Sequence, residues 1–127
     1  METQPRTGLT YRDIEELPEE RRELIEGELI VPSSPSTRHQ LAVGELLRRL
    51  SNHAKEHGGV ALTAPFDIKF SDINVLQPDV LFVAQENLAR IGERFASEAP
   101  DLVIEVSSPS TRQLEHLRKR EIFERYG

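Results

Sequence analysis

The sequence predicts a mixed α/β fold in which helices pack against a sheet. One long segment, from about Arg38 to His57, repeats apolar residues at helical spacing, and two short apolar runs, 77–83 and 102–107, have the length of buried strands. Each run carries a carboxylate, Asp79 in the first and Glu105 in the second. Because an unpaired interior carboxylate costs several kcal/mol, the sequence also predicts a site where these two acids find partners.

Composition narrows the class of protein. A chain of 127 residues, 37% hydrophobic and 30% charged, is long enough for one globular domain with a core, which we expect to span residues 1–127. The absence of cysteine excludes disulfides, thiolate metal sites and a cysteine nucleophile. The apolar runs are too short for a membrane span or a signal peptide, so we expect a cytoplasmic protein. A net charge of −6 argues against a surface wholly committed to nucleic acid but allows a local basic face.

The N-terminal part predicts a short helix followed by a hairpin. Thr10 and Asp13 have the spacing of a capping pair, and Pro18 interrupts the helical pattern that follows them. Glu26-Gly27 separates two apolar pairs and suits a tight turn between two strands.

The next element is the long helix, which Ser36 or Thr37 can cap and Gly58-Gly59 can close. Its apolar face is predicted to comprise Val43, Leu46, Leu47, Leu50 and Ala54. Three histidines, His39, His53 and His57, fall within the same arc. They are either ligands or proton carriers, or packed and hydrogen-bonded histidines without such a role. His39 stands out because it lies at the helix start, where a ligand can approach.

The second half predicts more strands and a last helix. Residues 61–70 and 77–83 are expected to pair antiparallel, with turn residues 71–74 between them, and 86–94 to form a surface loop with a helical turn. Pro100 introduces a third core strand, 102–107. After it, Ser110 or Thr111 can cap a final helix that runs to the end of the sequence.

Lys119 lies at the centre of the apolar arc of this final helix, which Ile122, Phe123 and Tyr126 define. The ammonium group either reaches out to solvent along its aliphatic stem or carries its charge to the buried carboxylates.

Asp79 and Glu105, if they converge, form a hard-oxygen site suited to magnesium or manganese. Such an ion polarises a phosphoryl oxygen and activates a bound water, while a nearby lysine orients the water or stabilises developing charge. This is the chemistry of phosphodiester hydrolysis. The alternative is structural, with Asp79 capping a turn after Pro78 and Glu105 paired with Lys119. The sequence contains no phosphate-binding glycine loop, serine nucleophile elbow or zinc-binding histidine pair.

Several segments together resemble the Uma-two family of restriction endonuclease-like proteins, in the PD-(D/E)XK nuclease superfamily. These segments are 23–28, His39, 78–80, 101–106 with 108–111, and 119–121, within a resemblance that spans residues 11–127. The resemblance implies a restriction-endonuclease-like core in which a mixed central sheet is flanked by helices, with the N-terminal helix and hairpin preceding it.

The resemblance also implies a site and an activity. Asp79 and Glu105 would be the metal ligands, and the lysine that usually stands at the position of Ser107 would be replaced by Lys119 on the following helix. Glu26 and His39 match further family positions as possible accessory residues. The implied activity is a magnesium- or manganese-dependent endonuclease acting on DNA. The alternative is an inactive relative that serves as a binding or interaction module.

The sequence departs from the family pattern at its end. Family members continue into a further strand beyond the position of Gly127, so we expect the C-terminal strand to be missing here. An uncovered sheet edge of this kind would favour a homodimer.

Overall fold

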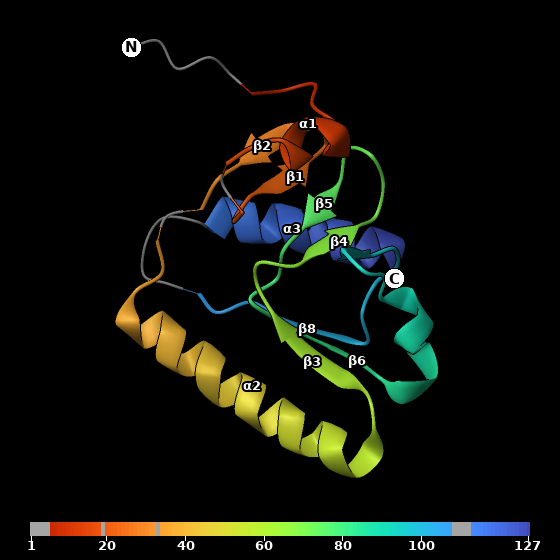
Figure 1. Ribbon diagram of the computed structural model, residues 1–127. Coiled ribbons are helices and arrows are strands. Elements are labelled where there is room, and N and C mark those ends of the chain that lie inside the picture. The colour runs from red at the N-terminus through yellow and green to blue at the C-terminus, as the bar shows by residue number, and fades with distance from the viewer. Residues whose placement is uncertain (1–5, 19, 33, 108–112) are drawn as a thin grey trace.

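The computed structural model describes residues 6–18, 20–32, 34–107 and 113–127, which form a mixed α+β fold (Figure 1). The predicted fold class is confirmed. In chain order the elements are α1 (Tyr11–Glu15), β1 (Glu23–Ile25), β2 (Glu28–Ile30), α2 (Thr37–His57), β3 (Val60–Thr63), β4 (Asp67–Lys69), β5 (Val75–Leu76), β6 (Val80–Val83), the 3₁₀ helix η1 (Gln85–Arg90), β7 (Phe95–Ala96), β8 (Leu102–Ile104) and α3 (Gln113–Tyr126).

The strands form two sheets instead of one central sheet. A five-stranded sheet has the order β2-β1-β5-β4-β7 and is mixed, because β4 and β7 are parallel, while the three-stranded sheet β3-β6-β8 is antiparallel. The expectation of one continuous strand over residues 61–70 is wrong. Pro65 lacks a backbone N–H and lies between β3 and β4, which belong to different sheets.

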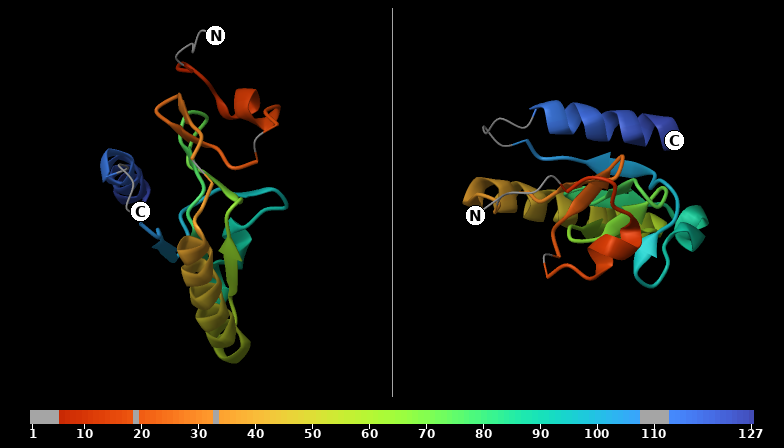
Figure 2. Two further views of the ribbon diagram at one scale, coloured as in Figure 1. Left: turned by 90° about the vertical axis from the view of Figure 1, so that its left-hand side faces the viewer. Right: turned by 90° about the horizontal axis from the view of Figure 1, so that it is seen from above.

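The five-stranded sheet lies between α1 and α3, and successive residues of its strands face opposite helices. Leu24 and Val75 pack with α1, whereas Ile25 and Leu76 pack with α3. Figures 1 and 2 show α3 on the opposite side of this sheet from α1. The short β1 and β5 strands are therefore buried on both faces, which explains why Leu24-Ile25 and Val75-Leu76 are apolar without alternation.

The three-stranded sheet has α2 on one side and the interior of the protein on the other. Phe82 meets His53 of α2 edge to face, with ring centroids 5.5 Å apart. Leu81 and Val83 point the other way, into a cluster with Ile68 of the five-stranded sheet. The alternation predicted for residues 79–83 is confirmed, and it turns the side of β6 that includes Asp79 toward the interior.

Local signals in the sequence account for the helix starts and the hairpin. The Thr10 backbone N–H donates to Asp13 Oδ2 at 2.8 Å, and Ser36 Oγ accepts the N–H of His39 at 3.1 Å. Glu26 and Gly27 connect β1 to β2 with φ angles of 48° and 82°, the positive values that a tight two-residue hairpin turn requires. The predicted caps Ser110 and Thr111 of the final helix lie outside the described residues. No described helix is long and apolar enough to cross a membrane.

Two glycine substitutions should shift stability in opposite directions. Gly27→Ala should lower the free energy of unfolding by about 1 kcal/mol, because alanine resists the positive φ, although its Cβ would meet only ordinary contacts at 3.4 Å and beyond. Gly44→Ala, within α2 and with no atom within 4 Å of the added Cβ, should raise it by up to about 1 kcal/mol. Urea unfolding of both variants measures the two shifts, and changes of the same sign would contradict this account of the turn.

Candidate active site

Asp79 and Glu105 face each other across the end of the three-stranded sheet. The last pairs of β6 and β8 join Val80 to Ile104 and Leu81 to Val103, so one further step of the same register brings Asp79 opposite Glu105. Residues directly opposite in an antiparallel pair have Cβ atoms about 5 Å apart. The Val106 N–H donates to Asp79 Oδ2 at 2.7 Å, which ties the two chain segments together at this point.

Asp79 is a buried and well-compensated carboxylate, with 5% of its side chain exposed. Arg21 Nη2 donates to Oδ1 at 2.9 Å, and His39 Nε2 lies 3.2 Å from Oδ2. Burial alone would raise the pKa of Asp79, but the Val106 N–H, Arg21 and His39 outweigh it and hold the pKa below its usual value. Asp79 is therefore ionised at neutral pH.

Lys119 turns inward, toward the carboxylates. Its ammonium Nζ lies 2.6 Å from Glu105 Oε1 and 2.7 Å from Glu23 Oε2, and only 7% of its side chain is exposed. Burial would lower the pKa of Lys119, but the adjacent charges of Glu23 and Glu105 outweigh burial and raise it. Lys119 thus stays charged, and α3 delivers that charge to the end of β8.

Glu105 has fewer positive and hydrogen-bonding partners than Asp79 among the described residues. Burial raises the pKa of Glu105 to about 7, with Lys119 opposing the shift and the negative charges of Glu23 and Asp79 adding to it. Its Oε1 is in ion-pair contact with Lys119 but accepts no well-aligned hydrogen bond from any described residue. A further positive charge at this carboxylate would be strongly favourable.

Glu23 is a member of the site that sequence reasoning missed. It opens β1, is 4% exposed, and its Oε2 accepts the backbone N–H of Gln77 at 2.7 Å in addition to the contact with Lys119. The signal was present, because Glu23 precedes Leu24-Ile25 as Asp79 precedes its own apolar strand. Arg21 was also missed, and no sequence pattern separates it from any other surface arginine.

The structure does not bring Glu26 to this group. Its carboxylate lies on the turn between β1 and β2, is about half exposed, and accepts a hydrogen bond from Arg125 Nη1 at 2.7 Å. That bond lowers the pKa of Glu26. The two residues between Glu23 and Glu26 carry the chain out of the interior, so the accessory role expected for Glu26 has no support from its contacts. His39, in contrast, lies beside Asp79 as described above.

A buried network of hydrogen bonds around Asp67 is connected to Glu23 through Gln77. Arg22 makes two hydrogen bonds to Asp67, at 2.8 and 3.2 Å, and Gln77 Nε2 donates to the same carboxylate at 2.8 Å. Tyr11 also donates to Asp67, and burial together with the Asp67 charge raises the pKa of Tyr11 to about 12. Gln77 therefore joins two groups, with its side chain on Asp67 and its backbone N–H on Glu23.

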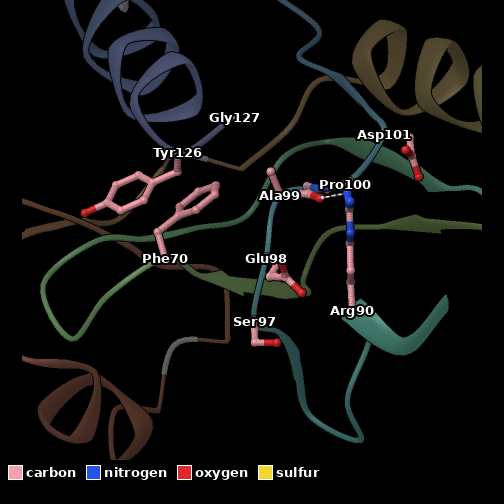
Figure 3. Close-up of a pocket in the computed structure, with 9 residues that line it drawn as sticks. All are labelled: Phe70, Arg90, Ser97, Glu98, Ala99, Pro100, Asp101, Tyr126 and Gly127. Carbon is pink, nitrogen blue, oxygen red and sulfur yellow. Dashed lines mark hydrogen bonds between the residues drawn. The ribbon is translucent and has the colours of Figure 1, made fainter. Parts of the chain in front are cut away.

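Two cavities lie near α3, and one of them is lined by Glu105, whereas Asp79 lines neither. A cavity of about 540 Å³ between β8 and α3 is lined in part by Glu105 and Lys119. The other, of about 380 Å³, is shown in Figure 3 with Phe70, Tyr126 and Arg90 among its lining residues. It includes none of Asp79, Glu105 and Lys119, so we assign the approach to the site to the first cavity.

The residues fit a hard divalent cation. Among the described residues no cluster of three or more histidines, aspartates and glutamates is arranged to hold a metal ion. Asp79 and Glu105 can supply two oxygen ligands, the number that magnesium commonly takes from a protein when water and substrate phosphate complete its shell. The observation that favours such an ion is that buried Glu105 has one cationic partner among the described residues, Lys119, which it shares with Glu23.

The raised pKa of Glu105 predicts a specific dependence of stability on pH. The native state binds a proton at Glu105 that the unfolded state has already lost between about pH 4.5 and 7, so the wild type should lose stability as pH rises through this window. The loss due to Glu105 has an upper limit of about 3 kcal/mol. Glu105→Gln should remove this component, as measured by urea unfolding in EDTA at several pH values. Identical slopes for both proteins would contradict the assignment.

Comparison with known proteins agrees with the fold and the motifs. The structure is similar to that of a "putative nuclease belonging to DUF820" from Anabaena variabilis ATCC 29413, with a TM-score of 0.76 and 23% sequence identity over 94% of this chain and 69% of that chain. At this identity the likeness shows the fold. No curated protein matches the sequence. The family model Uma2, described as "Putative restriction endonuclease", matches residues 10–127, and the chain therefore belongs to the Uma2 family.

Proposed function

We propose that this protein is a metal-dependent endonuclease that hydrolyses phosphodiester bonds in DNA. The observation that carries the proposal is the placement of the buried Lys119 ammonium 2.6 Å from Glu105, with Asp79 opposite Glu105 in the strand register. Membership of the Uma2 family and the nuclease-like fold support a nuclease. The divalent cation and DNA as the substrate are our inferences from the chemistry of the group.

In this proposal Asp79 and Glu105 hold magnesium or manganese. The bound ion supplies Lewis-acid polarisation of a phosphoryl oxygen and lowers the pKa of a bound water. Asp79 is already ionised, whereas Glu105 must lose its proton before it can serve as a ligand. Loading of the site should therefore compete with protons near pH 7.

Lys119 is the third residue of the proposed active site, beside Asp79 and Glu105. Its charge is fixed by two carboxylates and does not depend on the substrate, so the ammonium is in place before the phosphodiester arrives. A preorganised positive group can orient the attacking water or stabilise the negative charge that develops on the phosphoryl oxygens. Glu23 holds Lys119 from the opposite side, which limits the positions that the ammonium can take.

A cleavage assay tests the proposal. Nicking of supercoiled DNA should require magnesium or manganese and should fall by at least about 100-fold in Asp79→Ala and in Glu105→Gln, because each removes a ligand or a charge on which the transition state depends. Glu45→Gln is the matched control, since Glu45 is an exposed carboxylate on α2 that pairs with Arg48 and Arg49. Its activity should equal that of the wild type. Wild-type protein that cleaves no DNA form, or unchanged cleavage by both site variants, would refute the proposal.

A second candidate function follows because the charges of Asp79 and Lys119 already have partners within the protein. Asp79 accepts two hydrogen bonds and lies against His39, and Lys119 contacts two carboxylates, so the group can also be read as a structural ion-pair network in an inactive relative that binds a partner. The two functions differ in what a divalent cation does to the folded state, because an ion that binds only the native protein must stabilise it.

Thermal melting with magnesium separates the two functions. For the nuclease, magnesium at ten times its Kd should stabilise the wild type by about 1.4 kcal/mol, and Glu105→Gln should lose most of this shift. For the inactive relative, magnesium should leave the melting temperature unchanged, while Glu105→Gln still alters the stability of the metal-free protein. Differential scanning calorimetry with and without the ion, and with EDTA as the reference, gives both measurements.

A further inference from the structure

Among the described residues, Arg21 is the single partner of Asp79 Oδ1. The guanidinium Nη2 donates to Oδ1 at 2.9 Å, whereas Oδ2 receives both the Val106 N–H and the contact with His39. The Arg21 side chain is 34% exposed, while Asp79 is 5% exposed. Arg21 therefore lies at the rim of the site, between its buried carboxylate and solvent.

The neighbouring Arg22 shows that arginines in this segment do not all lie at the rim of the site. Arg22 is 9% exposed and is fixed by two hydrogen bonds to Asp67 inside the protein. Arg21 has one ion-pair partner among the described residues, Asp79, and its side chain is the more exposed of the two. Its contact with Asp79 can break without disturbing the buried network.

A divalent cation on Asp79 would conflict with this contact. Two positive groups a few ångströms apart repel each other, and the repulsion is stronger near a protein surface than in bulk water. The least constrained of the Asp79 partners is Arg21, because the Val106 N–H belongs to the backbone and His39 is fixed on the first turn of α2. Arg21 is thus the group that would leave.

We infer that Arg21 is an exchangeable counterion, which neutralises Asp79 in the metal-free protein and moves to a backbone phosphate of the nucleic acid when the cation binds. The inference rests on the proposed function. A planar guanidinium with several donors matches phosphate oxygens better than a point charge does, and the Arg21 side chain is 34% exposed beside a carboxylate that is 5% exposed. The exchange would make tight DNA binding at this position depend on the ion.

The first arm of the test is calorimetric titration of the protein with MnCl₂ in the absence of DNA. Arg21→Gln should bind Mn²⁺ about three- to fivefold more tightly than the wild type, because the ion no longer has to displace a partly exposed ion pair. Arg21→Lys keeps the competing charge and should bind Mn²⁺ as the wild type does. Arg49→Gln is the matched control, since Arg49 is an exposed arginine paired with a carboxylate on α2.

The second arm measures binding of a fluorescently labelled DNA duplex by anisotropy, with Ca²⁺ or with EDTA. With Ca²⁺, Arg21→Gln should bind the duplex more weakly than the wild type, and the slope of log K against log salt should shrink by about 1. With EDTA the two proteins should bind alike, because Arg21 remains on Asp79. Arg21→Lys should fall between them with Ca²⁺, and it provides the comparison if Arg21→Gln fails to fold.

The outcomes separate the exchange from the proposed function. Unchanged or weaker Mn²⁺ binding by Arg21→Gln, or an equal loss of DNA binding with Ca²⁺ and with EDTA, would overturn the exchange and leave the nuclease proposal intact. Wild-type protein that binds no Mn²⁺ would overturn both. Tighter Mn²⁺ binding together with a loss of DNA binding seen only with Ca²⁺ would establish Arg21 as the exchanging group.

Discussion

The ammonium of Lys119, held between Glu23 and Glu105, is the interaction on which the rest of the structure depends. It joins three parts of the fold: α3, strand β1 of the five-stranded sheet, and the end of β8 in the three-stranded sheet. Removing one partner of a buried ion pair leaves an uncompensated charge and costs several kcal/mol. The contacts that place the lysine in the candidate active site are therefore the same contacts that tie the two sheets to the last helix.

The segment Gln77-Pro78-Asp79 connects the Lys119 ion pairs to the remainder of the protein. Gln77 binds Asp67 with its side chain and Glu23 with its backbone N–H, and two residues later Asp79 enters the site. Buried polar groups rigidify a structure when each of them is satisfied. The Asp67 network thus fixes Glu23, Glu23 fixes Lys119, and the geometry around Glu105 follows from hydrogen bonds that begin on the far side of the five-stranded sheet.

The sequence predicted the features that neighbouring residues determine, such as helix starts and the hairpin turn. It did not predict features that depend on contacts between residues far apart in the sequence. Capping residues located the starts of α1 and α2, apolar periodicity indicated α3, and Glu26-Gly27 located the hairpin. The apolar pattern of residues 61–70 could not show that its two halves join different sheets. The buried carboxylates and Lys119 were predicted from charges in apolar surroundings, but Glu23 was noted only within the hairpin and the family segment 23–28 and not as a site residue. Arg21 carries no local signal, because its partner is 58 positions away.

The two candidate metal ligands are compensated unequally by positive charge, and under the proposed function this inequality would allow an acidic protein to accept a phosphodiester. Asp79 has a backbone N–H, an arginine and a histidine, whereas Glu105 shares its single lysine with Glu23 and has its pKa raised to about 7. The deficit of positive charge is local, and it lies beside a cavity that opens to solvent. A net charge of −6 over the whole chain weakens long-range attraction to nucleic acid, but it does not oppose a cation at Glu105. Since phosphate and carboxylates can share one divalent ion, the same charge deficit that costs the metal-free protein stability would favour the ion through which the substrate is held.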